Sequence, residues 1–164
     1  MIARFTGRNR FLSNFEPAVV CFDGLAFPTV EHAFQAAKTH DPEWQLKIQR
    51  AATPGKAKSL GRRVPLIPAW DEMKVDVMRE LVRQKFESPR AAGKGGQNER
   101  LFGYHTLLLK TGEVEIVEGN DWHDVFWGKC GCPGHGGKGE NWLGRLLMEV
   151  REELMEVREE LREA

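Results

Sequence analysis

Apolar residues recur at helical spacing near the start of this chain, between residues 27 and 38. Thr29 is placed to cap the N-terminus of a helix, and Pro28 marks the end of an extended segment. Four side chains then follow the i, i+3, i+4, i+7 pattern of a buried stripe: Val30, Ala33, Phe34 and Ala37. The pattern predicts a short helix over residues 29–40.

Polar residues form a second stripe on the same helix. Glu31, Gln35 and Lys38 have the spacing that places a carboxylate, an amide and an amine along one edge. Two interpretations are open: an amphipathic helix whose charged side chains are solvated, or the wall of an active site. Spacing alone favours the solvated face, and only other motifs can change that preference.

Further helical patterns occur at residues 42–52, 54–62, 70–86 and 98–110. The first two of these begin with proline, which is favoured in the opening turn of a helix. The third is the longest and has an apolar inner face. The glycine-rich run at residues 93–96 predicts a flexible break before the last of them.

Strand-like segments predict a small sheet near the N-terminus. Residues 19–22 and 25–27 flank Asp23-Gly24, which is the strongest short signal for a hairpin. Residues 2–5 are a candidate third strand, and Cys21 is expected in the core. The predicted fold class is α+β, a compact, mainly helical single domain with a small N-terminal antiparallel sheet.

The C-terminus carries a tandem heptad, because residues 148–154 repeat identically as residues 155–161. A seam with alternating three- and four-residue spacing runs through Leu147, Val150, Leu154, Val157 and Leu161. Two heptads are marginal alone, so the helix packs on its own domain or on a second copy of the chain, which permits a weak homodimer. We expect a domain at residues 1–151 and a helical extension at residues 152–164.

Composition narrows the function classes. The chain has 164 residues, enough for one domain with a real core. Lys and Arg balance Asp and Glu at 24 each, which argues against broad non-specific binding of nucleic acid. No apolar run approaches a membrane span and no signal-peptide pattern opens the chain, so the expected location is cytoplasmic. The odd number of cysteines, 3, fits reduced thiols.

Two loop-like segments follow a strand-like stretch at residues 114–117. Residues 118–128 contain three carboxylates, an amide, a histidine and two tryptophans. Such residues suit a planar heterocycle and its polar edges, and a capped turn with two core tryptophans is an equal alternative. Residues 137–148 form a glycine-rich loop that opens a helix, which suits an anion or a sugar hydroxyl, or is simply a tight connection.

A cluster of metal-binding residue types lies between these loops. Cys130, Cys132 and His135 offer three ligands, and His123 offers a fourth for a tetrahedral zinc ion. The spacing matches no standard zinc finger, and one short loop must supply nearly all ligands. We therefore expect no metal and free thiols here, with zinc as the alternative.

Five segments resemble, in content and order, the YbiA-like proteins of the NADAR superfamily: residues 11–17, 27–38, 57–62, 122–128 and 139–148. The resemblance covers nearly the whole chain up to residue 151. It implies a mainly helical α+β fold and hydrolysis of N-glycosidic bonds. Family members are associated with phosphoribosylamino-pyrimidine intermediates of riboflavin synthesis, and others with removal of ADP-ribose from guanine. The loop at residues 130–135 is often shorter in the family, and the repeated heptad lies outside the family core.

The implied reaction assigns roles to three residues. Cleavage of a ribosyl C–N bond builds positive charge at the anomeric carbon. Glu31 is the expected carboxylate that stabilises this charge or activates water. Lys38 is expected to hold a phosphate or polarise the leaving group, or to attack the anomeric carbon and form a Schiff base. Asp124 is the second candidate for an acid or base.

Substrate contacts are assigned by the same resemblance and by residue chemistry. Trp122 and Trp127 are expected to stack on the base. Asn14, Asn120 and Asn141 are expected to hold ribose hydroxyls. Arg10 and Arg62 are candidates for phosphate. The expected binding set is completed by Phe15, Gln35 and Gly128.

The sequence therefore predicts a hydrolase that cleaves the N-glycosidic bond of a ribosylated heterocycle. The substrate is a phosphoribosylamino-pyrimidine or an ADP-ribosylated guanine. The alternative is a non-catalytic module that binds ADP-ribose or a nucleotide. No cofactor and no membrane partner are expected.

Overall fold

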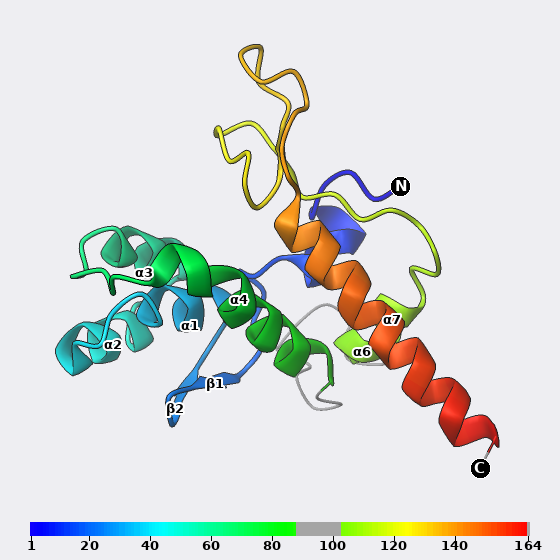
Figure 1. Ribbon diagram of the computed structural model, residues 1–164, viewed down its shortest axis with the longest axis horizontal. Helices are drawn as coiled ribbons and strands as arrows, with labels where there is room; N and C mark the ends of the chain where they lie inside the picture. Colours follow the sequence, from blue (N-terminus) through cyan, green and yellow to red (C-terminus); the bar gives the residue numbers. More distant parts are fainter. Residues whose placement is uncertain (88–102, 164) are drawn as a thin grey trace. The chain divides into compact units, whose positions relative to one another are not determined.

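The computed structural model of this protein describes residues 1–87 and 103–163 (Figure 1). Internal contacts divide the chain into two units. The central unit is Asn14–Tyr104, and the terminal unit is Met1–Ser13 together with His105–Ala164. The predicted break at residues 93–96 and the first part of the helix predicted at 98–110 lie outside the described residues.

The central unit opens with the predicted antiparallel hairpin of β1 (Val20–Phe22) and β2 (Leu25–Phe27). Asp23 and Gly24 in its turn have φ values of 49° and 77°, the positive pair that a two-residue turn of this type requires. The expectation that Cys21 lies in the core is wrong, because its side chain is exposed. Successive side chains of a strand point to opposite faces, and the flanking Val20 is the buried one.

Four helices follow in the central unit: α1 (Val30–Ala36), α2 (Pro42–Gln49), α3 (Pro54–Gly61) and α4 (Trp70–Glu87). The first three helices are capped at their N-termini, where a side-chain oxygen accepts a backbone N–H bond. The accepting side chains are those of Thr29, Asp41 and Thr53. Helix α1 packs against the other three, so it is the centre of this unit. The predicted end of α1 at residue 40 is wrong, because the chain leaves the helix in a turn after Ala36.

The terminal unit contains the 3-10 helix η1 (Gly7–Leu12), nearly all of α6 (Tyr104–Leu109) and the long α7 (Trp142–Glu163), drawn in orange to red in Figure 1. Two short strands, β3 (Gly119–Asn120) and β4 (Lys129–Cys130), pair in parallel.

The strands predicted at residues 2–5 and 114–117 are wrong as strands. They are reduced to one parallel bridge between Ile2 and Ile116. Two backbone bonds hold this bridge: Ile2 N–H donates to the Glu115 carbonyl, and Val117 N–H donates to the Ile2 carbonyl.

The apolar face of α7 makes much of the core of the terminal unit. Its buried members are Leu143, Leu146, Leu147, Val150 and Leu154. The seam then leaves the core, because Val157 and Leu161 are exposed. Arg151 is buried beside this face and donates to the Thr111 hydroxyl and the Val114 carbonyl.

The architecture agrees with the predicted class, a mainly helical α+β fold with a small antiparallel hairpin near the N-terminus. Among the helices of residues 1–87 and 103–163, none has the length and apolar character needed to cross a membrane.

Candidate active site

Helix α1 buries its polar stripe as well as its apolar one. All seven residues from Val30 to Ala36 are buried. Glu31 is 6% exposed and Gln35 is 3% exposed. The Gln35 Nε2 donates to the Glu31 Oε1 at 2.7 Å. The interpretation of a solvated helix face therefore does not hold for these residues.

Several contacts fix the first turn of α1. The Thr29 hydroxyl accepts the His32 backbone N–H, and the His32 Nδ1 lies 2.8 Å from the same hydroxyl. The His32 Nε2 donates to the Ala51 carbonyl at 3.0 Å. The Glu31 N–H donates to the Asn14 carbonyl at 3.1 Å. The backbone that carries Glu31 is thus held from both sides of the helix start.

Burial and charge shift the acid and the amine of this site in opposite directions. Burial raises the pKa of Glu31, although its hydrogen bond from Gln35 and the charges of Lys58 and Lys38 oppose that rise. Burial lowers the pKa of Lys38, and the charge of Glu31 works against this effect. Each shift enlarges the population of the neutral form relative to the free side chain, which is the direction that favours proton transfer between the two groups.

A cluster of cations acts on Lys38, and one of them, Lys58, also acts on Glu31. Lys58, Arg62 and Lys74 each lower the pKa of Lys38 by charge repulsion. Lys58 is half-buried on α3, and Arg62 is exposed just after α3. The sequence placed Lys58 in a basic cluster that could bind phosphate but assigned it no contact, and it assigned no role to Lys74. Lys58 stands inside the motif at residues 57–62, whereas nothing in the sequence pattern singled out Lys74.

Gln35 is also packed tightly against α3. A β-carbon on Gly61 would lie 1.9 Å from the Gln35 Oε1, so glycine is required where α3 approaches the amide. That oxygen is buried, and among residues 1–87 and 103–163 it has no hydrogen-bond partner. The amide nitrogen is committed to Glu31, so the oxygen remains as an acceptor.

The other predicted contacts of the central unit differ in exposure. Asn14 is buried, and its amide nitrogen donates to the Met78 sulfur at 3.4 Å. Phe15 is 43% exposed. Arg10 belongs to the terminal unit, where it lies exposed in η1. Their roles in substrate binding stay predictions.

In the terminal unit, Asn120 and Asp124 brace one turn. The Asn120 Nδ2 donates to the Asp124 carbonyl, and its Oδ1 accepts the Asp124 N–H. The Asp124 Oδ1 accepts the N–H groups of Phe126 and Trp127 at 3.1 and 2.8 Å. These bonds match the capped turn of the alternative interpretation, but its expectation that both tryptophans lie in the core is wrong. Trp122 in the same turn is 59% exposed, and Trp127 is half-buried.

Asn141 and Gly128 tie this loop to the start of α7. The Asn141 Oδ1 accepts the Glu118 N–H, and its Nδ2 donates to the Ile116 carbonyl. A β-carbon on Gly128 would lie 2.1 Å from the Glu118 carbonyl oxygen, so the close approach requires glycine. Within the glycine-rich segment at residues 137–148, a β-carbon on Gly139 would lie 2.1 Å from the Gly128 carbonyl oxygen, so the segment includes the tight connection that the sequence left open.

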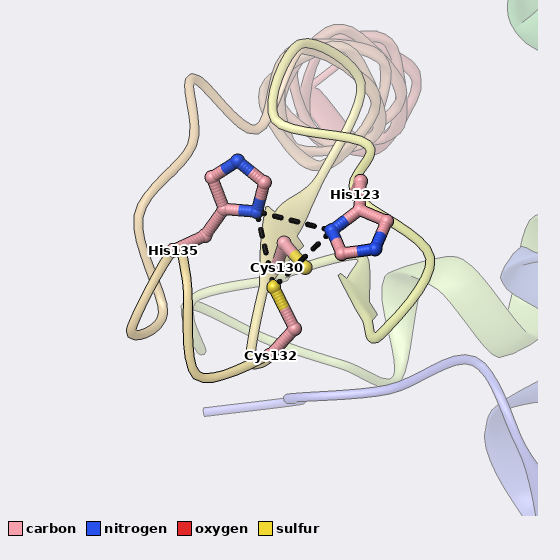
Figure 2. Close-up of side chains that lie close together, drawn as sticks. All are labelled: His123, Cys130, Cys132 and His135. Atoms are coloured by element: carbon pink, nitrogen blue, oxygen red, sulfur yellow. Dashed lines mark hydrogen bonds between the residues drawn. The ribbon is translucent and has the colours of Figure 1, made fainter.

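Four side chains of the same unit converge, as Figure 2 shows: His123, Cys130, Cys132 and His135. One ligand atom from each lies within 4.8 Å of the others. Burial opposes ionisation of the Cys130 thiol, but hydrogen bonds with Cys132 and His123 outweigh this effect and lower its pKa. The sequence identified all four residues as the metal alternative, and the structure brings them together.

Comparison with known proteins identifies relatives across most of the chain. The NADAR domain model matches residues 4–155. N-glycosidase YbiA of Escherichia coli is 39% identical over 144 residues, covering 87% of this chain and 79% of that protein. An N-glycosidase of Nostoc punctiforme is 37% identical over 147 residues, covering 87% and 83%. A riboflavin biosynthesis protein of Vibrio vulnificus is 39% identical over 146 residues, which are 88% of this chain but 35% of that protein.

A solved structure is also similar. The NMR structure of Escherichia coli YbiA matches with a TM-score of 0.75 and 35% sequence identity, covering 96% of this chain and 87% of that chain. The match therefore extends over the sequence and the fold together.

Proposed function

The chain belongs to the NADAR domain family and is an N-glycosidase, and from this premise we propose that Glu31 on α1 is its catalytic carboxylate. The observation that carries the proposal is the burial of Glu31 with a raised pKa inside a cluster of cations. A carboxylate is rarely buried unless it is paired or functional. A non-catalytic ADP-ribose-binding module, the alternative from the sequence, is set aside because the chain is an enzyme.

Lys38 is the proposed nucleophile. Its lowered pKa supports a population of neutral amine, which carries the lone pair that attack requires. The nitrogen forms a bond to the anomeric carbon while the bond from that carbon to the heterocycle's amine breaks. The leaving nitrogen takes a proton from neutral Glu31, and the ionised Glu31 then takes a proton from the lysine nitrogen. The sugar–lysine adduct opens to a Schiff base, and water hydrolyses it to free the sugar and regenerate the amine.

Lys58 and Arg62 are the proposed phosphate ligands. Both act on the Lys38 amine through their charges, and both are on or just after one helix. Charge-assisted hydrogen bonds from these two cations would compensate a phosphate bound there for the hydration that it loses. The proposed substrate is therefore a ribosylated heterocycle that carries phosphate. A phosphoribosylamino-pyrimidine of riboflavin synthesis and an ADP-ribosylated guanine both meet this description.

For the terminal unit we propose roles in stacking on the base, in acid–base chemistry and in positioning a loop. Trp122 is exposed and available to stack on a planar base. Asp124 is the second acid or base through its remaining carboxylate oxygen. Asn120 and Asn141 use both ends of their amides within the protein, so we propose that they act by positioning the loop.

Base release tests the proposal directly. The purified protein is incubated with a phosphoribosylamino-pyrimidine and, separately, with DNA carrying ADP-ribosylated guanine, and the freed heterocycle is measured. We expect release from at least one substrate. Glu31→Gln keeps the side-chain shape and should lower kcat about 10²–10⁴-fold, the usual contribution of an acid–base group. Glu72→Gln alters an exposed carboxylate on α4 and should retain full activity.

The possible outcomes distinguish an error in the proposed substrate class from an error in the proposed catalytic residue. Release from neither substrate would overturn the proposed substrate class. Release by the Glu31→Gln protein at the wild-type rate would overturn the assignment of Glu31, provided that its circular dichroism spectrum matches that of the wild type.

A further inference from the structure

We propose that His123, Cys130, Cys132 and His135 form a structural zinc site in the terminal unit (Figure 2). The site is separate from the chemistry assigned to Glu31 and does not depend on it. The inference rests on the geometry of four ligand atoms and on the hydrogen-bonding capacity of their side chains.

The spacing of three of the four ligand atoms fits a tetrahedral metal, and the Cys130 sulfur lies within 4.8 Å of all three. The His123 Nδ1 and the His135 Nδ1 are 3.5 Å apart. The Cys132 Sγ lies 3.3 Å from the first nitrogen and 3.1 Å from the second. Zinc bonds of about 2.3 Å to sulfur and about 2.0–2.1 Å to nitrogen place tetrahedral ligand atoms at about 3.3–3.8 Å from each other. The observed triangle is within a few tenths of an ångström of that size.

Directed hydrogen bonds can account for at most two of these three close contacts. A neutral imidazole nitrogen carries either one hydrogen or one lone pair, so each Nδ1 supports one well-directed bond. Each Nδ1 here faces both the other Nδ1 and the Cys132 sulfur. A cation at the centre would accept all of these lone pairs at once, and the buried sulfur of Cys130 would supply the fourth.

The ligand chemistry selects zinc among common metals. Two sulfurs and two imidazoles in a tetrahedral set are typical of zinc, whereas magnesium and calcium prefer oxygen. Two thiolates neutralise the charge of the ion, so the complete site is neutral. That neutrality allows burial, and both Cys130 and Cys132 are buried. Four protein ligands leave no open position, so the ion is structural.

Backbone bonds already hold the ligand loop in its conformation. The Cys130 N–H donates to the Lys138 carbonyl, and the Gly137 N–H donates back to the Cys130 carbonyl. The N–H groups of His135 and Gly136 both donate to the Cys132 carbonyl. One short loop can therefore present three ligands, which answers the objection that the sequence raised.

The site joins this loop to the turn that carries Asp124. His123 comes directly before Asp124, and its backbone is left-handed with φ of 70°, a conformation that costs a non-glycine residue energy. Zinc would hold that strained residue in place. The ion would thereby fix the Asn120–Asp124 turn against β4, and its removal should loosen the turn.

Metal content tests the site. Protein purified under reducing conditions without chelator should contain about one zinc per chain by mass spectrometric metal analysis. Apoprotein titrated with cobalt(II) should develop the intense visible bands of tetrahedral, thiolate-bound cobalt, and equimolar zinc should abolish them. Cys132→Ser and His135→Asn should each weaken zinc affinity at least about 100-fold.

Matched controls use the same residue types outside the site. Cys21→Ser removes an exposed thiol and His40→Asn an exposed imidazole, and both should keep one zinc. Metal-free, cobalt-silent wild-type protein with a native circular dichroism spectrum would overturn the proposal. Full zinc binding by both Cys132→Ser and His135→Asn would overturn it as well, because the ion would then sit elsewhere. His135 is half-buried in a turn, so its substitution should leave the fold intact.

Discussion

At the scale of single residues, the burial of Glu31 makes the stability of the fold depend on pH. Glu31 occupies a helix whose residues are all buried, and its pKa is raised chiefly by burial. The unfolded chain releases the Glu31 proton at a lower pH than the folded chain does. The stability that protonated Glu31 contributes at low pH is therefore lost as the pH rises from the ordinary pKa of glutamate through the raised pKa of Glu31 in the folded chain.

Glu31→Gln should remove this pH-dependent loss. The glutamine amide oxygen can still accept the bond from Gln35, and no charge is buried. We expect the variant to match the wild type near about pH 4 and to unfold at higher urea concentration near about pH 7. Urea titrations at both pH values measure the difference, and Glu72→Gln should show none. A variant that is less stable than wild type at neutral pH would mean that the ionised carboxylate stabilises the fold.

A separate prediction at the scale of single residues concerns the proposed nucleophile, Lys38. Lys38→Arg keeps a positive charge but removes the nucleophile, because a guanidinium is not deprotonated in proteins. Borohydride added during turnover should reduce the Schiff base and leave a sugar covalently bound to the wild-type chain, detected by mass spectrometry. Lys38→Arg should give no adduct and little turnover, whereas Lys56→Arg, on the exposed side of α3, should behave as wild type. Turnover by the wild type without any adduct would assign the attack to water.

At the scale of elements, the sequence predicted helices well where caps and proline act locally. The starts of α2 and α3 were predicted from the prolines of their opening turns, and the structure adds the caps Asp41 and Thr53 just before them. The strands predicted at residues 2–5 and 114–117 are reduced to one bridge, because a strand needs a partner that local pattern does not specify. The same limit applies to Glu31. Its spacing was visible, but its burial depends on α2, α3 and α4 packing around α1.

The tandem heptad of α7 gives a matched pair of leucines for a stability prediction. Leu154 and Leu161 occupy equivalent positions of the repeat, yet Leu154 is 8% exposed and Leu161 is 75% exposed. Leu154→Ala should lower the free energy of unfolding by about 2–3 kcal/mol, since it opens a cavity. Leu161→Ala should change it by less than about 0.5 kcal/mol. Equal losses at the two sites in dilute protein would show that the second heptad is also buried, by contacts beyond its own chain.

At the scale of the whole molecule, the second heptad raises the question of self-association that the sequence left open. Val157 and Leu161 lie exposed on the same seam that buries Val150 and Leu154 in the terminal unit. This strip is short and carries charged residues on either side, so a coiled coil built on it is marginal. We therefore predict a weak monomer–dimer equilibrium. Sedimentation velocity over a wide concentration range should show the mean mass rising only at the highest concentrations.

Leu161→Glu should abolish that rise, because it places a like charge on both copies of the paired seam. Lys138→Glu changes charge by a larger amount at an exposed site in a loop and should leave the association unchanged. A constant monomer mass at every concentration would exclude the dimer. A dimer that persists in Leu161→Glu would use a surface other than α7. Activity per chain should be the same in monomer and dimer, since every group assigned to the reaction lies outside the second heptad.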